Sequence, residues 1–255
     1  MIDKIITTLD ETTTERLRTE GGVFLIDKPL EWTSFDVVNK LRYRLKNLLK
    51  DKKLKVGHAG TLDPLATGLL IVCVGKMTKQ IDSFMGQPKS YTGAFKLGAT
   101  TPTYDRETAE DAHFPTDHIT PSVLEAARVQ FLGEIDQLPP IYSAIKQEGT
   151  PLYELARKGK EVVVTPRRIT IHQFDIQPIT NENIEFYVHC SKGTYIRSLA
   201  FDFGKACNSG AYLTALRRTA IGDFSIEKAW NLEVLTKALG GELTPSVSRT
   251  SAPEF

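Results

Sequence analysis

The fold is decided by the stretch KVGHAGTLDPLATGLLIVCVGK, residues 55–76, in which a glycine-rich segment leads into a continuous apolar run. The run LLIVCV has the length and composition of a strand that is buried on both faces. Ahead of it, Pro64 disfavours helical backbone at Asp63, and glycines at 57, 60 and 68 permit unusual backbone angles. The stretch therefore predicts a rigid, open turn that displays the Asp63 carboxylate and is anchored by a core strand.

An Asp-Pro pair also begins many ordinary turns, and the local pattern alone favours that interpretation over catalysis. The chemical alternative is a lone acid beside cationic and aromatic groups. That combination is consistent with a carboxylate nucleophile acting on a substrate held by a basic surface. The residues of this stretch permit both interpretations.

The composition is that of a globular protein of one large domain, or of a large domain with a small appendage. The chain has 255 residues, of which 41% are hydrophobic and 25% charged. The N-terminus has no apolar signal region, and no run of eighteen apolar residues is present. The three cysteines lack CxxC spacing, which predicts reduced, packed thiols and a cytoplasmic protein.

Other common chemistries lack their sequence signatures. The five histidines show no HExxH or HxH spacing, so no metal site is expected. The GK pair at Gly75 follows a hydrophobic strand rather than a phosphate-binding loop, and no GxGxxG follows a strand. The sequence therefore predicts no zinc site, no nucleoside triphosphate hydrolysis and no Rossmann-type cofactor.

The chain contains two basic regions, although its net charge is only +1. Residues 39–58 hold eight lysines and arginines against one aspartate, and residues 146–168 are also rich in cations. A charged run is usually just a solvated helix face, so this signal is weak by itself. The clusters nevertheless leave room for an anionic partner such as RNA.

The periodicity predicts an α+β protein. Thr33 and Asp36 have capping-box spacing and open a helix with a helical apolar period, whereas Thr120 and Gly133 mark the ends of another. The polar segment 103–118 is predicted to be a surface loop. Further predicted elements are strands at 23–26, 69–75, 90–101, 184–190 and 211–224, a short helix stopped by Gly159, a Val-rich strand after it, and a helix closed by Gly210.

The motifs resemble those of the TruB-type tRNA pseudouridine synthases. GHAGTLDPLATGLLIVCVGKMTK matches the signature around the catalytic aspartate of that family. In the family's order, the chain also carries LIDKPLEWTSFDVV, YTGAFKLGATTPTYD, PPIYSAIKQEGTPLYELARKG, HCSKGTYIRSLAFDFG and LTALRRTAIGDF. The resemblance covers roughly residues 21–225.

The resemblance implies a fold and a domain layout. The fold would be a mixed, largely antiparallel sheet with flanking helices and a central RNA-binding cleft. An N-terminal extension would span residues 1–20, the catalytic domain 21–240 and a flexible tail 241–255. This would be a short form without the C-terminal PUA domain of many members. One departure is Glu31, which stands where the family's KPxGxTS motif has glycine.

The resemblance also implies an activity, the conversion of the T-loop uridine at position 55 of tRNA to pseudouridine on a flipped-out base. Asp63 would be the nucleophile and would attack either C1′ of the ribose or C6 of the base. Tyr91 would stack on the base and help to remove the C5 proton. Arg197 would pair with Asp63 and hold it ionised.

Five further residues would bind the substrate, according to the same resemblance. Tyr195 and Leu216 would line the uridine pocket, and His58 would fill the space that the flipped base leaves. Lys28 and Lys79 lie in family motifs as well. By base rate, however, tyrosines and leucines at such positions are more often core residues, and an arginine at a helix start often makes only a weak exposed pair.

The expected partner is the T arm of tRNA, bound by a monomer with no membrane association. Two alternatives stay open at this point. The chain is also compatible with the related dyskerin-type branch, in which a separate RNA guides the enzyme, although that branch relies on a PUA domain. An RNA-binding or tRNA-folding module with incidental catalysis is the third possibility.

Overall fold

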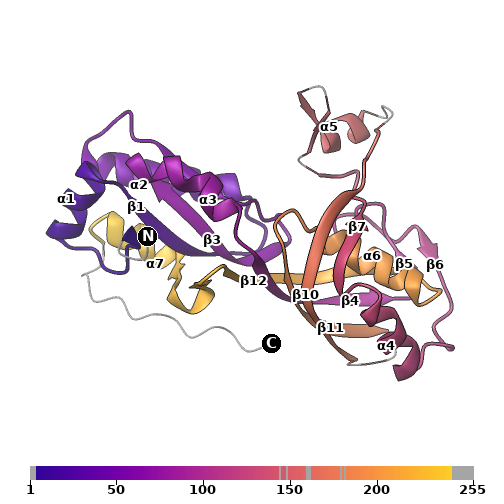
Figure 1. Ribbon diagram of the computed structural model, residues 1–255. Helices are drawn as coiled ribbons and strands as arrows, with labels where there is room; N and C mark the ends of the chain where they lie inside the picture. The colour runs from indigo at the N-terminus through magenta and orange to yellow at the C-terminus, as the bar shows by residue number, and fades with distance from the viewer. Residues whose placement is uncertain are drawn as a thin grey trace. The chain divides into compact units, whose positions relative to one another are not determined.

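The computed structural model describes residues 4–143, 145–147, 149–158, 162–178, 180 and 182–242 (Figure 1). These residues form an α+β fold with a mixed, mostly antiparallel sheet, as predicted. The chain divides into two compact units. The first contains the described residues up to Lys89 and from Arg217 onward, and the second contains Ser90–Leu216. Strand β12, Ala211–Ile221, contributes residues to both.

The first unit is built on β3, Ala66–Val74, which is the apolar run of the opening stretch. Strand β1, Gly22–Lys28, pairs with it antiparallel from Gly22 opposite Val74 to Lys28 opposite Gly68. The strand order is β14-β1-β3-β12. Beside this path, β2, Val56–Ala59, pairs with β3 and β13, Phe224–Ser225, pairs with β12, whereas the short β14, Trp230–Asn231, runs parallel to β1.

Two hydrophobic cores cover the two faces of β1 and β3, and this explains the continuous apolar run. Phe24 and Val72 point into a core shared with helices α1, Glu11–Thr19, α2, Ser34–Leu49, and α7, Leu232–Leu239. Their neighbours along the two strands, such as Leu25 and Ile71, point into the other core. That core includes residues of the 3₁₀ helix η2, Gly75–Gln80, and of α3, Ile81–Met85.

The second unit has the strand order β12-β4-β11-β10-β7. Its strands are β4, Lys89–Leu97, β7, Gly133–Gln137, β10, Arg167–Pro178, and β11, Asn183–Cys190, and its longer helices are α4, Pro121–Val129, and α6, Ile196–Ala206. A cluster of four phenylalanine rings holds the sheet to α6: Phe95, Phe174, Phe186 and Phe203.

The remaining elements are short. They are β5, Ala99–Thr100, β6, Ala112–His113, β8, Lys146–Gln147, β9, Thr150–Pro151, α5, Leu152–Arg157, and the 3₁₀ helix η3, Ile226–Lys228. No helix in the described part of the chain is long and apolar enough to cross a membrane.

Most of the predicted elements are confirmed, including the Thr33–Asp36 capping box and the Thr120 N-cap. Three predictions were wrong in extent. Helix α4 ends at Val129, and Gly133, with φ +86°, begins β7 instead. Helix α6 ends at Ala206 rather than near Gly210. The Val-rich run 162–165 lies outside any strand, and β10 begins only at Arg167, after Pro166, which has no N–H for a ladder.

The cysteines behave as packing residues. Cys73, Cys190 and Cys207 are all buried, and none of these three forms a disulfide. Burial raises the pKa of Cys73 to about 12 and that of Cys207 to about 11, so both are poor nucleophiles at neutral pH. The proposed boundaries at residues 20 and 240 stay predictions, and residues 243–255 of the predicted tail lie outside the described residues.

The turn between β1 and α2 explains the departure at Glu31. This residue adopts a left-handed conformation, with φ +66°, and its N–H donates to the Pro64 carbonyl at 2.9 Å. A left-handed conformation brings Cβ too close to the following carbonyl oxygen, so glycine is the least strained residue at this point.

Glu31→Gly is therefore expected to stabilise the protein by ~0.5–1 kcal/mol, because the relief of strain exceeds the added flexibility of the unfolded chain. Urea unfolding measures the change. Glu31→Ala is the matched control, since it removes the carboxylate but keeps Cβ. An equal gain in both variants would show that the effect comes from the charge and not from the backbone.

Candidate active site

Asp63 lies in the Asp63 loop, residues 60–65, which connects β2 to β3. The residue is half-buried, and its carbonyl accepts a hydrogen bond from Ala66 N–H at 3.1 Å. At two of the glycines around this loop, the structure shows why a residue with a side chain is disfavoured. Gly60 has φ +92°, and a Cβ on Gly68, with φ +102°, would lie 2.3 Å from the Arg218 carbonyl oxygen. The loop therefore begins in a left-handed turn and ends at a close backbone contact.

One side of the Asp63 loop is held by the N-terminal part of the first unit. The Lys28 ammonium is fully buried and donates to the carbonyls of Pro29 at 2.9 Å, Trp32 at 2.6 Å and, more weakly, Pro64 at 3.4 Å. Ser34 Oγ accepts from Leu62 N–H at 2.9 Å and donates to the Leu62 carbonyl at 3.2 Å. The residues on both sides of Asp63 are thus tied to the turn that starts α2.

The other side of the loop is held by Arg218. This guanidinium is 1% exposed and donates to the carbonyls of Leu69 at 2.8 Å, Gly60 at 3.0 Å and Thr61 at 3.4 Å. Hydrogen bonds from a cation are roughly twice as strong as neutral ones. The backbone of the Asp63 loop is therefore fixed by two buried cations that reach it from different elements.

Burial shifts the titration of the groups around this loop. It lowers the pKa of Lys28 to about 8, and the nearby Asp63 carboxylate partly offsets the effect. The pKa of His58 is also lowered, by burial and by the Arg218 charge, so this imidazole is neutral at physiological pH. His58 Nδ1 is buried and has no hydrogen-bond partner among the described residues.

In the second unit, Arg197 at the start of α6 is buried against a carboxylate. Its Nη1 donates to the Thr103 carbonyl at 3.1 Å, and its Nε lies 3.6 Å from Asp105 Oδ2. The Asp105 carboxylate also accepts from Thr103 Oγ1 at 2.6 Å and from Glu107 N–H at 2.9 Å. The guanidinium is therefore held by a hydrogen-bonded acid rather than exposed at a surface.

Asp105 was missed by the sequence analysis. The prediction that residues 103–118 form a surface loop was wrong at its start, because Thr103 and Asp105 are buried. The Asp105 side chain accepts a hydrogen bond from the N–H of Glu107, two residues further along the chain. This is the local turn that aspartate side chains commonly form. Arg197, the second residue of α6, was the only other signal. The predicted partner of Arg197, Asp63, lies in the first unit, and that pairing stays a prediction.

The other predicted site residues occupy different environments. Tyr91 on β4 is buried on the strand face that also carries Phe95. Tyr195 precedes α6, and its backbone N–H and carbonyl both bond to the Gln137 side chain, at 2.8 and 3.1 Å. Leu216 on β12 is half-buried, and Lys79 on η2 is exposed. The convergence of these residues with Asp63 on one substrate stays a prediction.

Lys28 is placed differently from a substrate ligand. Since its three donors are directed at carbonyl oxygens in the protein interior, the geometry favours a positioning role for the Asp63 loop. No three histidine, cysteine, aspartate or glutamate side chains gather into a metal-binding group in the part of the chain that the structure describes.

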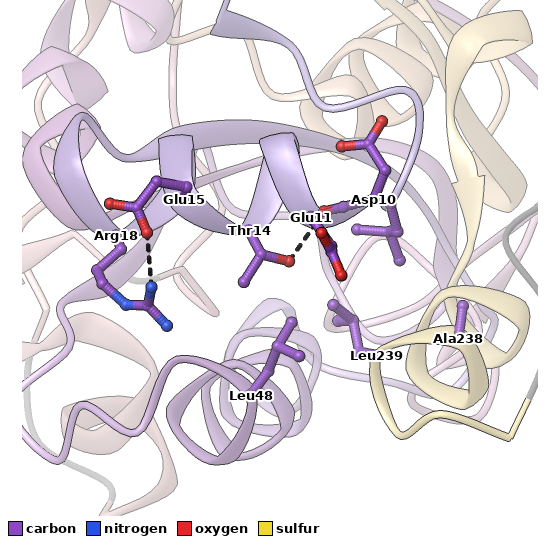
Figure 2. A pocket seen from close by; sticks show the side chains of 9 residues that line it. Asp10, Glu11, Thr14, Glu15, Arg18, Leu48, Ala238 and Leu239 are labelled. Atoms are coloured by element: carbon purple, nitrogen blue, oxygen red, sulfur yellow. Dashed lines mark hydrogen bonds and ion pairs between the residues drawn. The ribbon is translucent and has the colours of Figure 1, made fainter.

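A groove of about 400 Å³ lies between α1, α2 and α7 in the first unit (Figure 2). Leu9, Leu48 and Leu239 form its apolar part. Three acidic residues, Asp10, Glu11 and Glu15, also line it, and Arg18 is paired with Glu15 at 2.6 Å. An excess of carboxylates repels phosphate, so this groove does not suit RNA.

The model of the TruB family pseudouridylate synthase (N terminal domain) matches residues 46–196, which include Asp63, Tyr91 and Asp105. The chain belongs to this family. Among TruB-family relatives, the tRNA pseudouridine synthase B of Flavobacterium johnsoniae is 57% identical over 221 residues, which cover 86% of this chain and 96% of that protein. The protein of the same name from Phocaeicola vulgatus is 50% identical and covers 84% of this chain and 91% of its own length.

Solved structures confirm the pseudouridine synthase fold of this TruB-family chain. A chain in the crystal structure of a Cbf5-Nop10-Gar1 complex matches with a TM-score of 0.64 at 28% identity over 88% of this chain. A structure of an H/ACA RNP bound to a substrate RNA containing 2′-deoxyuridine matches with a TM-score of 0.62 at 24% identity, and so shows the fold alone. This chain spans 56% and 54% of the length of those two chains.

The depressed pKa of Lys28 predicts a specific dependence of stability on pH. Its ordinary value is 10.5, so between pH 8 and 10.5 the unfolded chain binds more protons than the folded one. The free energy of unfolding of the wild type, relative to that of Lys28→Met, is therefore expected to rise with pH across this window, by at most about 3 kcal/mol. Urea unfolding at several pH values measures the difference, and a difference that falls or stays level contradicts the assignment.

The buried pair of Arg197 and Asp105 predicts a loss of stability on neutralising the acid. Asp105→Asn leaves the Arg197 charge without its buried carboxylate and is expected to cost ~3 kcal/mol of unfolding free energy. Glu125→Gln is the matched control, because it makes the same chemical change at an exposed carboxylate that pairs with Arg128, and it is expected to cost much less than Asp105→Asn. Equal costs in the two variants would mean that burial of the Asp105 carboxylate does not matter.

Proposed function

We propose that this TruB-family chain converts the uridine at position 55, in the T loop of tRNA, to pseudouridine, with Asp63 as the nucleophile. Family membership makes the protein a pseudouridine synthase, which is an isomerase. The observation that carries the finer proposal is the Asp63 loop, in which a GHAGTLDP motif is fixed by Lys28, Ser34 and Arg218. The name tRNA pseudouridine synthase B of its relatives supports tRNA as the substrate.

The reaction rearranges one nucleotide and needs no oxidant or reductant. The Asp63 carboxylate attacks either C1′ of the ribose, which displaces N1 of the base, or C6 of the base, after which the C1′–N1 bond breaks. The detached base turns, C5 forms the new bond to C1′, and the bond that joins Asp63 to C1′ or to C6 breaks, which frees the carboxylate. The C5 proton then leaves and N1 gains a proton, so substrate and product have the same atoms. Tyr91 is proposed to stack on the base and to help to remove the C5 proton.

Arg197 is proposed to contribute its charge near the nucleophile. The pair with Asp105 and the bond to the Thr103 carbonyl fix the direction of the guanidinium, so Asp105 acts as a positioning residue. An arginine held this way loses little conformational entropy when substrate binds. A cation beside a carboxylate favours its ionised, nucleophilic form.

A folded T loop buries its uridine, so the base must leave the stack before it reacts. Extrusion costs a few kcal/mol, and stacking on an aromatic side chain returns ~1–3 kcal/mol per base. Tyr91 and Tyr195, with phosphate contacts from the basic regions, are proposed to supply this energy to a monomeric enzyme. Side chains of Lys146 and Arg157, and all of Lys160, lie outside the described residues.

The proposed function is tested by Asp63→Asn, which keeps the size of the side chain but removes its nucleophilic charge. Tritium release from tRNA that carries [5-³H]uridine reports loss of the C5 proton, and the variant is expected to be slower by at least about a thousandfold. Binding of the tRNA, followed by fluorescence anisotropy, is expected to change little.

Wild-type enzyme with no added factor provides the control, together with a transcript that has cytidine at position 55. Release from the wild type with the uridine transcript and none with the cytidine transcript supports the site assignment. A requirement for a guide RNA would favour the dyskerin-type alternative. Unchanged release by Asp63→Asn would contradict the nucleophile assignment.

A further inference from the structure

Two large apolar side chains are exposed next in the chain to residues that bond to the Asp63 loop. Leu30 is 53% exposed and Phe35 is 61% exposed. Each is the neighbour of a residue that bonds to the loop, because Glu31 N–H donates to the Pro64 carbonyl and Ser34 Oγ bonds to Leu62. Single exposed apolar residues are common, but these two adjoin the residues that hold the loop of the one acid that the proposed function uses.

Phe35 begins a stripe along one flank of α2. Asn39, Arg42 and Lys46 follow it at four-, seven- and eleven-residue spacing, which places all four residues on one side of the helix. The direction of this flank is known, because Arg42 Nη2 donates to the Val56 carbonyl in β2 at 2.9 Å. Strand β2 leads directly into the Asp63 loop. The stripe therefore starts at the loop with an aromatic ring and continues with two cations over about 16 Å.

We propose that Phe35 is a stacking platform for the nucleobase next to the target uridine and that Lys46 holds a phosphate of the same RNA strand, while Arg42 adds its charge and stays bonded to Asn39 and Val56. This inference rests on the proposed function, since it takes the substrate to be an RNA loop with a flipped base.

The chemistry of the stripe selects this occupant. When the target base leaves its stack, its neighbour in the strand loses a stacking partner on that side. An exposed phenyl ring replaces the partner with little cost in entropy. A cation further along the same flank matches the negative backbone that continues from that base. The acidic groove between α1, α2 and α7 has the opposite charge and does not compete for the strand.

The test measures the dissociation constant of a fluorescein-labelled T-arm hairpin by anisotropy. Phe35→Ala is expected to raise the constant about 5- to 150-fold, the range that loss of one base stack produces. Phe35→Trp is expected to restore binding because the indole also stacks. Lys46→Gln is expected to weaken binding and to lower the salt dependence by slightly less than one counterion.

Tyr43→Ala is the matched control. Tyr43 is 66% exposed on the same helix and lies about 80° around the helix axis from Phe35, so its loss is expected to weaken binding much less than the loss of Phe35. Thermal unfolding confirms that each variant is folded, as expected for exposed positions.

Hairpins with an abasic nucleotide on the 5′ or the 3′ side of the target uridine identify the base. On one of these two hairpins, Phe35→Ala is expected to have no further effect, because the stacking partner is already absent. Unchanged binding by Phe35→Ala, an equal loss in Tyr43→Ala, or a full effect on both abasic hairpins overturns the proposal. Absence of tritium release by the wild type is a separate outcome. It overturns the proposed function, whatever the binding measurements on the Phe35 variants show.

Discussion

The Asp63 loop depends on two buried cations that bond to backbone carbonyls instead of to acids. Lys28 reaches the loop from β1, and Arg218 reaches it from the part of β12 that belongs to the first unit. These hydrogen bonds, here called the carbonyl grip, fix the path of the chain through its backbone oxygens. Burying the Lys28 ammonium costs solvation free energy, and this burial lowers the pKa of Lys28 to about 8. A buried charge is expensive unless its donors are satisfied, and here each cation has three carbonyl partners.

The rest of the first unit supports this grip. Pairing of β1 with β3 brings Lys28 opposite Gly68, so the lysine and the end of the loop are held in register by the sheet. The close contact between Gly68 and Arg218 requires the absence of a side chain, and it brings the guanidinium under the loop. The capping box of α2 then directs Ser34 at Leu62. Glu31 adds a further bond to the loop, because its N–H donates to the Pro64 carbonyl, although its left-handed backbone conformation is strained.

The sequence predicted what periodicity and capping control, namely the buried β3, the start of α2, the strand of Tyr91 and the α+β class. It did not predict what depends on long-range contacts. The burial of Asp105 could not be read from a polar segment, because its partner Arg197 is 92 positions further along the chain. The sequence also did not predict that Lys28 and Arg218 bond to backbone carbonyls of the protein. A lysine or an arginine in such a motif is equally typical of a residue that binds RNA. The choice between an ordinary turn and a catalytic loop came from the family motif.

The most direct test of the carbonyl grip is hydrogen–deuterium exchange of the Asp63 loop in wild type and in Lys28→Met at neutral pH. If the lysine holds the loop, exchange at residues 60–65 becomes faster in the variant while the centre of β3 keeps its protection. Equal exchange of the loop in both proteins, or a uniform increase across β1 and β3, would contradict the view that Lys28 sets the conformation in which Asp63 is presented.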